Sequence, residues 1–449
     1  MLPWGPPPGA VEPYFSAINR EKGAPKGAPF LFEEVLSGNL DKYQAEKEEQ
    51  DRPLMTRVRE KDREVLYEMS NPKEMKQGFF SRMMASSSYK KYILPGLISQ
   101  SVIIAGGYGT GRELVEYFVN FGSLGGILGM ALVTTTLWSL VFAVSYEFAR
   151  TFKVYDYRSF FKELLGPGWV LYEVCYIVLL LIVLGVVGAT SGSIFMQSFG
   201  LPPLVGAALF LAGVATLTFF GSYVIEIAMS WWSYLLYAVF LVFLLVGISQ
   251  VGDQIGASLA TGEIKEGWAL GGFKYAFYNL GTFPAILFAL NYIESRKEAV
   301  ISGIMTSIIT ILPGFFLYLV IMGFYPGILD VEVPAYTILG EIAPWLLPVY
   351  MVVLFGTMIE TGAGFIHAVN ERINSWMVDH KGKGLTKANR GVLGGLMALV
   401  GLGVASFGLI GLIAKGYGTI SWGFFLLHGV ALFTLGLYKI SKKNAKIPA

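Results

Sequence analysis

The chain has few cysteines, histidines and charged residues for its length of 449 residues. Cys175 is the one cysteine, which excludes a disulfide framework or a cysteine-based metal site within one chain. The three histidines, His367, His380 and His428, form no closely spaced metal-ligand pair. No nucleophile–base pair or phosphate-binding loop is present in the sequence, so we expect neither an enzyme nor a bound cofactor. The formal net charge of +2 gives no reason to expect a nucleic acid partner.

Hydrophobic residues make up 54% of the chain and charged residues 15%, with a mean hydropathy of +0.56. This composition is typical of a protein that crosses the bilayer several times. Of the 66 charged residues, 29 lie in residues 1–91, which contain no signal peptide and no long apolar segment. We therefore expect residues 1–91 to form a charged cytoplasmic tail.

From Tyr92 onward, apolar segments of about 20 residues recur, the length that an α-helix needs to cross the hydrocarbon core. The expected fold class is therefore an all-α integral membrane protein with ten transmembrane helices. The ten predicted spans are residues 92–121, 123–149, 168–195, 201–222, 226–250, 273–293, 300–325, 345–374, 391–412 and 417–440.

The placement of lysine and arginine predicts the orientation of these spans. With the N-terminus inside, the inner segments after span one hold 15 Lys and Arg, whereas the outer segments hold only Lys265, Lys274 and Lys415. We therefore expect a multi-pass protein of the cell (cytoplasmic) membrane with both termini in the cytoplasm. The expected parts are the tail 1–91, a first five-helix repeat 92–250, an extracellular loop 251–272, a second five-helix repeat 273–440 and a cytoplasmic tail 441–449.

Two predicted spans contain residues that disfavour a continuous helix. In span one, glycines occupy four of the six positions 106–111, and each costs about 1 kcal/mol relative to alanine in a helix. In span six, Gly281 and Pro284 interrupt the apolar segment. The alternatives are a glycine face for helix packing in span one and a kinked but continuous span six. Because the breaks fall on the first member of each group of five, they predict an inverted 5+5 repeat with discontinuous helices one and six.

Five plus five spans with such breaks resemble the LeuT-type fold of the amino acid–polyamine–organocation superfamily. Within it, the run Gly106–Glu113 followed by Leu114-Val115-Glu116-Tyr117-Phe118 resembles the YkvI family of bacterial membrane proteins. Tyr278-Asn279 in span six and Gly416-Tyr417-Gly418 entering span ten are also similar to that family. The resemblance covers about residues 92–440. It implies the LeuT-type fold and a transporter, but it does not name a solute.

Broken helices within a membrane expose backbone N–H and C=O groups that can bind a solute. The candidate substrate-binding residues are Gly107, Tyr108, Gly109, Thr110, Gly111, Arg112 and Glu113 in span one, with Tyr278, Asn279, Gly281 and Thr282 in span six. Arg112 can bind a carboxylate bidentately, or it can simply pair with Glu116 four residues later. Glu113 can act as a counter-charge to an amine.

A second candidate site surrounds Glu360, a carboxylate near the middle of span eight. Such a group costs about 2.5–3.5 kcal/mol on insertion scales, so it should face the protein interior. In LeuT-type transporters, hydroxyls of span eight and carbonyls of span one make a sodium site, which the resemblance places at Thr357 and Thr361. The candidate residues for ion or proton coupling are Ile104, Ala105, Thr357, Glu360 and Thr361. The alternative is a buried structural carboxyl group bonded to neighbouring hydroxyls.

The sequence therefore predicts a secondary active transporter that moves a small organic solute by alternating access. An amino acid or related zwitterion is the expected solute, and Na⁺ or H⁺ is the expected coupling ion. The expected partners are thus a small-molecule solute and the lipid bilayer, and no oligomeric state is predicted. Two alternatives stay open, an inorganic-ion or metal-ion transporter or channel and a membrane sensor that retains the fold without moving solute.

Overall fold

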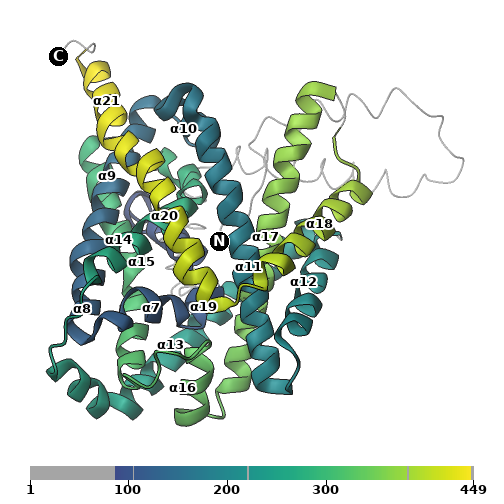
Figure 1. The fold of residues 1–449 in the computed structure, drawn as a ribbon. Coiled ribbons are helices and arrows are strands. Elements are labelled where there is room, and N and C mark those ends of the chain that lie inside the picture. The colour runs from purple at the N-terminus through teal and green to yellow at the C-terminus, as the bar shows by residue number, and fades with distance from the viewer. Residues whose placement is uncertain (1–85, 105, 220–221, 382–383, 446–449) are drawn as a thin grey trace, which may run out of the picture. The chain divides into compact units, whose positions relative to one another are not determined.

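The structure, a computed structural model, describes residues 86–445 except Ala105, residues 220–221 and residues 382–383. Within that part of the chain all secondary structure is helical (Figure 1). The expected tail 1–91 lies outside the described residues except for residues 86–91. The first helix begins before the expected boundary at residue 92, because helix η1 (Tyr89–Ile93) continues directly into α5 (Leu94–Ile103).

The helices follow the apolar segments of the sequence. The first group comprises α6 (Gly106–Gly109), α7 (Arg112–Tyr117), η2 (Val119–Phe121), α8 (Ser123–Leu128), η3 (Gly129–Thr134), α9 (Thr135–Phe152), α10 (Tyr157–Leu165), η4 (Gly166–Gly168), α11 (Trp169–Phe199), α12 (Pro203–Phe219) and α13 (Ser222–Ala260). The second comprises α14 (Trp268–Asn279), η5 (Leu280–Ala285), η6 (Leu287–Tyr292), α15 (Arg296–Met322), α16 (Pro334–Ile342), α17 (Leu347–Lys381), α18 (Lys387–Ala405), α19 (Leu409–Gly411), η7 (Leu412–Tyr417), α20 (Gly418–Phe424), η8 (Phe425–Val430), η9 (Leu432–Gly436) and α21 (Leu437–Asn444).

Seven helical segments among the described residues are long and apolar enough to cross a membrane. They are Ser123–Phe152, Tyr157–Phe199, Leu235–Ala260, Arg296–Met322, Leu347–Asn374, Ala388–Ala405 and Leu409–Lys443. A shorter apolar helix, Pro203–Thr216, lies where span four was expected. The expected spans 92–121 and 273–293 consist of several short helical elements, so neither is counted among the seven. The ten-span count therefore stays a prediction.

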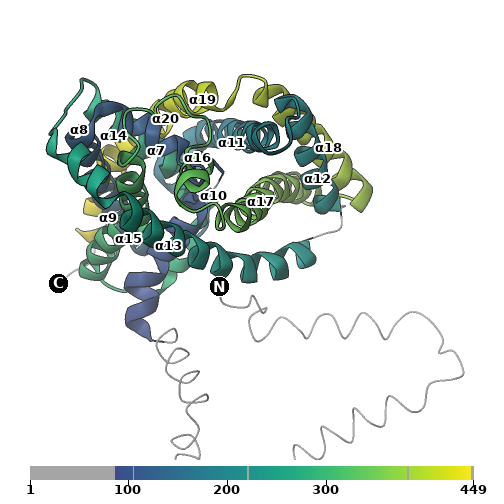
Figure 2. The ribbon, with the colours of Figure 1, turned by 90° about the horizontal axis from the view of Figure 1, so that it is seen from below.

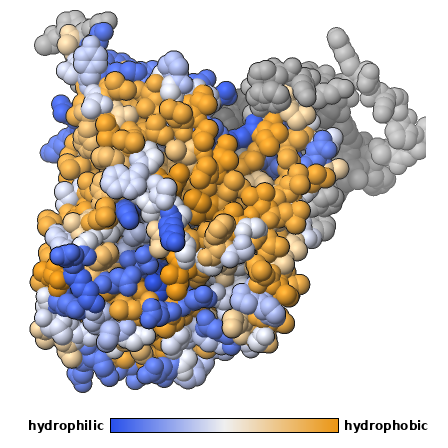
Figure 3. All heavy atoms as spheres, in the orientation of Figure 1, coloured by the Kyte–Doolittle hydropathy of each residue, from blue (hydrophilic) through white to orange (hydrophobic). Residues whose placement is uncertain are grey.

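Apolar side chains point away from the protein along these helices. Leu132, Leu140, Leu171, Leu245 and Leu399 are each at least half exposed. Figure 3 shows apolar residues gathered over one face of the helical unit. Large exposed apolar surfaces are costly in water but favourable in lipid, so the described chain is a multi-pass membrane protein.

The helices form two groups joined by α13. Helices α11, α12, α17 and α18 pack against one another and form one group. In the other group, α5 and α9 pack against α15, and α14 contacts α9. Helix α13 contacts both α15 and α17 (Figure 2). The interrupted segment α5–α7 therefore lies where both groups reach it, because α6 contacts α11 and α17 while α7 contacts α14 and α15.

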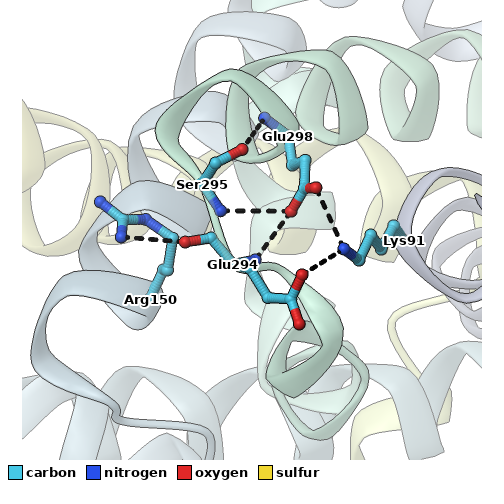
Figure 4. A network of polar contacts seen from close by, with 5 residues as sticks. All are labelled: Lys91, Arg150, Glu294, Ser295 and Glu298. Carbon is cyan, nitrogen blue, oxygen red and sulfur yellow. Dashed lines mark hydrogen bonds and ion pairs between the residues drawn. The ribbon is translucent and has the colours of Figure 1, made fainter. Parts of the chain in front are cut away.

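Residues that the sequence assigns to the inner side meet at one end of the unit, which we call the inner end. Lys91 Nζ lies 2.6 Å from Glu294 Oε2 and 3.0 Å from Glu298 Oε1 (Figure 4). The Arg150 guanidinium donates to the Glu294 carbonyl at 3.3 Å. Ser295 and Glu298 form a capping box at the start of α15, which fixes the Glu298 carboxylate beside Lys91. This network joins the start of span one, the end of α9 and the start of α15.

Residues that the sequence assigns to the outer side meet at the opposite end of the same helices, which we call the outer end. Ser123 and Thr261 hydroxyls lie 3.0 Å apart, and the Lys265 amide donates to the Phe121 carbonyl. Tyr325 donates to Glu263 at 2.5 Å. Predicted inner segments thus contact other inner segments, and predicted outer segments contact other outer segments. This agrees with the predicted alternation of inner and outer loops.

Close packing of α9 and α15 predicts a large effect of one methyl group. A Cβ atom at Gly303 of α15 would collide with the backbone of Ala143 on α9, whereas a Cβ at Gly403 of α18 would meet no atom within 4 Å. We expect Gly303→Ala to destabilise the protein by about 1–3 kcal/mol through overpacking. The apparent melting temperature of the purified protein measures this effect. Gly403→Ala, the matched control, should be neutral or stabilising, and equal stability of the two variants would contradict the packing.

Candidate functional site

The interruption of span one is a short irregular stretch with local causes. Helix α5 ends at Ile103, and Ile104 has the non-helical backbone angles φ −71° and ψ 79°. Gly111 takes the left-handed angle φ 81° immediately before α7, a conformation that glycine adopts without strain. The Thr110 hydroxyl accepts from the Arg112 amide at 3.2 Å and donates to the Gly107 carbonyl at 2.7 Å, which starts the new helix.

Glu113 is a buried carboxylate at the centre of the site. It lies in the first turn of α7 with 4% of its surface exposed. The Tyr278 hydroxyl of α14 donates to its Oε2, so the two interrupted spans meet at this bond. Gly107 leaves room for the carboxylate, because a Cβ atom there would collide with Glu113 Oε1. Among the described residues, no lysine, arginine or histidine forms an ion pair with Glu113.

Four buried tyrosines near this carboxylate contact one another through their rings, and we call them the tyrosine cluster. They are Tyr117 of α7, Tyr275 and Tyr278 of α14, and Tyr417 of η7, each at most 5% exposed. The rings of Tyr278 and Tyr417 are stacked with centroids 4.5 Å apart, and the ring of Tyr117 lies 5.6 Å from that of Tyr278. All four lie within electrostatic range of Glu113. Spans one, six and ten therefore all contribute to the same site.

The carbonyl groups freed by the break are satisfied by groups from the outer end. The Tyr350 hydroxyl of α17 donates to the Gly109 carbonyl, and the Ala335 amide of α16 donates to the Thr110 carbonyl at 2.9 Å. A backbone carbonyl inside a membrane needs such a partner because no water is there to replace it. Helices α16 and α17 are therefore held against the break by hydrogen bonds to the carbonyls that have no partner within span one.

Arg112 lies on another face of α7 and contacts the outer loop. Its Nη1 donates to the carbonyls of Leu329 at 2.5 Å and Val331 at 3.0 Å, and its Nη2 lies 3.3 Å from Glu116 Oε2. The side chain is 2% exposed. The sequence left open whether Arg112 binds a solute carboxylate or pairs with Glu116. The structure shows the pairing with Glu116, and Arg112 also donates to two loop carbonyls. In this arrangement most of the guanidinium donors are occupied by protein acceptors.

The remaining predicted substrate residues are buried, except for the partly buried Thr282, and they do not all meet. The Tyr108 hydroxyl lies against α15, where a Cβ at Gly314 would lie 2.9 Å from it, and the side chain is within electrostatic range of Glu113. Asn279 donates to the Tyr275 carbonyl at 3.0 Å, and Thr282 donates to the Asn279 carbonyl at 2.7 Å, so both extend the turn after α14. Gly281 packs against Phe424 of α20.

The predicted coupling residues lie in the break itself and in helix α17. The hydroxyls of Thr357 and Thr361 donate to carbonyls of their own helix α17, at 3.0 Å and 2.9 Å. Glu360 is partly buried and lies within electrostatic range of Tyr237 on α13. Ile104 is 2% exposed, and Ala105 lies outside the described residues. No contact between these residues and Glu113 is found in the described part of the chain.

Sequence reasoning missed Tyr117, Tyr275 and Tyr417 as members of the site. A usable signal was present for two of them, because residues four or three apart share a helix face. Tyr117 follows Glu113 by four residues, and Tyr275 precedes Tyr278 by three. Nothing in the local sequence of span ten indicates that Tyr417 stacks on Tyr278, since that contact depends on the packing of distant helices.

Comparison with known proteins agrees with this architecture. No family model matches the chain. The chain is 23% identical over 289 residues to the uncharacterised membrane protein YkvI of Bacillus subtilis (strain 168), which covers 61% of this chain and 79% of that protein. Among solved structures, it resembles a substrate-bound, outward-open Na⁺-coupled sialic acid symporter with a TM-score of 0.52 and 12% identity, over 77% of this chain and 78% of that one.

Two further structures are similar at lower scores. MhsT in complex with L-phenylalanine has a TM-score of 0.48 and 15% identity, over 78% of this chain and 97% of that one. A manganese transporter of Eremococcus coleocola has a TM-score of 0.41 and 16% identity, over 80% and 89% of the two chains. The relative and the symporter fold confirm the resemblance expected from the sequence: the chain is a YkvI-like, multi-pass membrane protein with the LeuT-type fold.

Proposed function

We propose that this protein is a secondary active transporter of a small organic solute, an amino acid or related zwitterion, that works by alternating access. The observation that carries the proposal is the buried Glu113 carboxylate, which joins the two interrupted spans through Tyr278 and has no cationic partner among the described residues. Broken helices that meet around an uncompensated charge are a usual form of a transporter site. The LeuT-type fold is compatible with this function.

We propose for this transporter the membrane topology that the sequence predicts. Ten spans form two five-helix repeats, residues 92–250 and 273–440, joined by an extracellular loop at residues 251–272. Spans one and six are discontinuous at the site, and both termini and the tails 1–91 and 441–449 face the cytoplasm. The inner and outer loop contacts on opposite ends of the helices support this assignment.

Alternating access requires that each end of the site can close. At the outer end, Arg112 and the Thr110 carbonyl hold the loop Phe324–Ala343 and its helix α16 against the break. At the inner end, Lys91 holds the start of span one against Glu294 and Glu298. The outer contacts join α7 to the loop that leads into α16, whereas the inner contacts join the start of span one to α15 within one group of helices. We propose that the outer contacts break when the two groups move relative to each other and that the inner contacts break when span one moves relative to α15.

The proposed coupling site uses Thr357, Thr361 and Glu360 of α17 with the backbone of Ile104 and Ala105. Helix α6, which follows these two residues, contacts α17. Hydroxyl oxygens that donate within their own helix keep lone pairs for a cation, so Thr357 and Thr361 remain suitable Na⁺ ligands. Glu360 would either join them as a ligand or carry a proton.

Solute uptake into proteoliposomes distinguishes Na⁺ from H⁺ coupling. With Na⁺ coupling, Thr361→Ala should lower the uptake driven by a Na⁺ gradient at least about tenfold, because the cation loses a ligand. With H⁺ coupling, Glu360→Gln should abolish uptake driven by a pH gradient while Thr361→Ala retains it. Glu341→Gln, which removes an exposed carboxylate of α16, is the control. Uptake that responds to neither gradient in the unaltered protein would contradict secondary active transport.

Weakening the inner contact should open the inner end. In a Cys175→Ser background carrying Thr282→Cys as reporter, we expect Lys91→Gln to increase the rate of thiol labelling about two- to fivefold. Partly exposed ion pairs contribute about 0.2–1 kcal/mol each, which corresponds to that range. Lys442→Gln, which removes the same charge from a side chain that lies over the Tyr438 ring, should label at the unaltered rate. Slower or unchanged labelling in Lys91→Gln would show that Lys91 does not hold the inner end closed.

A further inference from the structure

We propose that Glu113 and the tyrosine cluster recognise the cationic ammonium group of an organic solute, and that no solute carboxylate is needed for binding. This inference rests on the proposed transport function, and it extends the solute class from zwitterions to organic ammonium ions without a carboxylate. The site comprises the Glu113 carboxylate and the rings of Tyr117, Tyr275, Tyr278 and Tyr417.

The first argument is the uncompensated charge of Glu113. The carboxylate is 4% exposed, and the Tyr278 hydroxyl is the one side-chain donor found for it in the described part of the chain. The hydroxyl of Tyr117 is used elsewhere, because it donates to the Ile413 carbonyl at 2.7 Å. A buried carboxylate normally has a cation beside it, since burial of an isolated charge is costly. A cationic solute supplies that missing charge by displacing one hydroxyl.

The second argument is the chemistry of the surrounding rings. The faces of aromatic rings carry negative potential, so they do not stabilise a carboxylate but do stabilise a cation beside it. Four tyrosines from three spans lie within electrostatic range of this one carboxylate, with neighbouring ring centroids 4.5–5.9 Å apart. A carboxylate surrounded by aromatic rings is the usual protein environment for alkylammonium ions.

The third argument concerns Arg112, the one basic residue of the interrupted segment. A zwitterion needs a partner for its carboxylate, and Arg112 is the residue expected from the sequence to provide it. Its Nη1 and Nη2 instead contact Leu329, Val331 and Glu116. Its buried Nε has no hydrogen-bond partner among the described residues, but a single donor does not form the bidentate pair that binds a carboxylate. Among the described residues, the site therefore offers a strong partner to a cation and no bidentate partner to a carboxylate.

Isothermal titration of the purified full-length chain with three probes tests this inference. The probes are choline, the neutral alcohol in which a tert-butyl group replaces the trimethylammonium group, and glycine betaine, which adds a carboxylate. We expect choline to bind at least about tenfold more tightly than the neutral alcohol, and glycine betaine to bind no more tightly than choline. Equal binding of choline and the neutral alcohol would overturn the proposal.

Variants of the site separate charge from aromatic character. Glu113→Gln should weaken choline binding at least about tenfold, whereas Glu341→Gln on the surface should leave it unchanged. Tyr417→Leu should weaken it about three- to tenfold, while Tyr417→Phe, which keeps the ring face, should bind choline nearly as well as the unaltered protein. Unchanged choline affinity in both Glu113→Gln and Tyr417→Leu would overturn the proposal, even if one of the other variants fails to fold.

Failure of the proposed ammonium site can be distinguished from failure of the proposed transport function, because choline binding is measured without a membrane gradient. Choline binding that depends on Glu113 but is never followed by uptake into proteoliposomes would support this site and contradict transport. Uptake of a neutral or anionic solute that choline does not inhibit would support transport and contradict this site. Tighter binding of glycine betaine than of choline, lost in Arg112→Gln, would assign the solute carboxylate to Arg112 and overturn the proposal.

Discussion

The structure depends on one constraint, that every backbone carbonyl and amide inside a membrane must have a partner. The chain leaves helical geometry at Ile104 and again at Gly111, on either side of the short helix α6, so the carbonyls of Gly109 and Thr110 must find partners elsewhere. They find the Tyr350 hydroxyl of α17 and the Ala335 amide of α16. The break thus draws a distant helix and a loop onto itself, and these contacts enclose the place where Glu113 and Tyr278 meet.

Much of the fold was predictable because the membrane imposes a simple pattern on the sequence. The length of apolar segments predicted where the long helices lie, and most of them are present within a few residues of their expected bounds. The glycines of positions 106–111 indicated the irregular backbone, since few other residues tolerate it. The exception was the start of span one, where the helix begins before Tyr92 because Lys90 and Lys91 continue the same turn.

The site was less predictable because its contacts join residues far apart in the sequence. Glu113 and Tyr278 were both expected at the site from the two breaks, but Tyr417 reaches it from span ten through ring stacking alone. Arg112 was expected either to bind a solute carboxylate or to pair with Glu116, and the pair is present. Its other acceptors are carbonyls of a loop more than two hundred residues away. No local pattern specifies which loop will fill such a position. Three-dimensional packing was therefore needed to separate a binding residue from a structural one.

The neighbouring residues Arg112 and Glu113 have different roles because successive residues of a helix point about 100° apart. Each pairs along its own face, Arg112 with Glu116 and Glu113 beside Tyr117, so one short helix carries both the outer loop contact and the buried carboxylate. With only six residues, α7 cannot bend to move one face without the other. Any displacement of α7 that releases the loop from Arg112 must therefore also shift Glu113 relative to Tyr278. In the proposed transport cycle, this shift would couple opening of the outer end to the strength of solute binding.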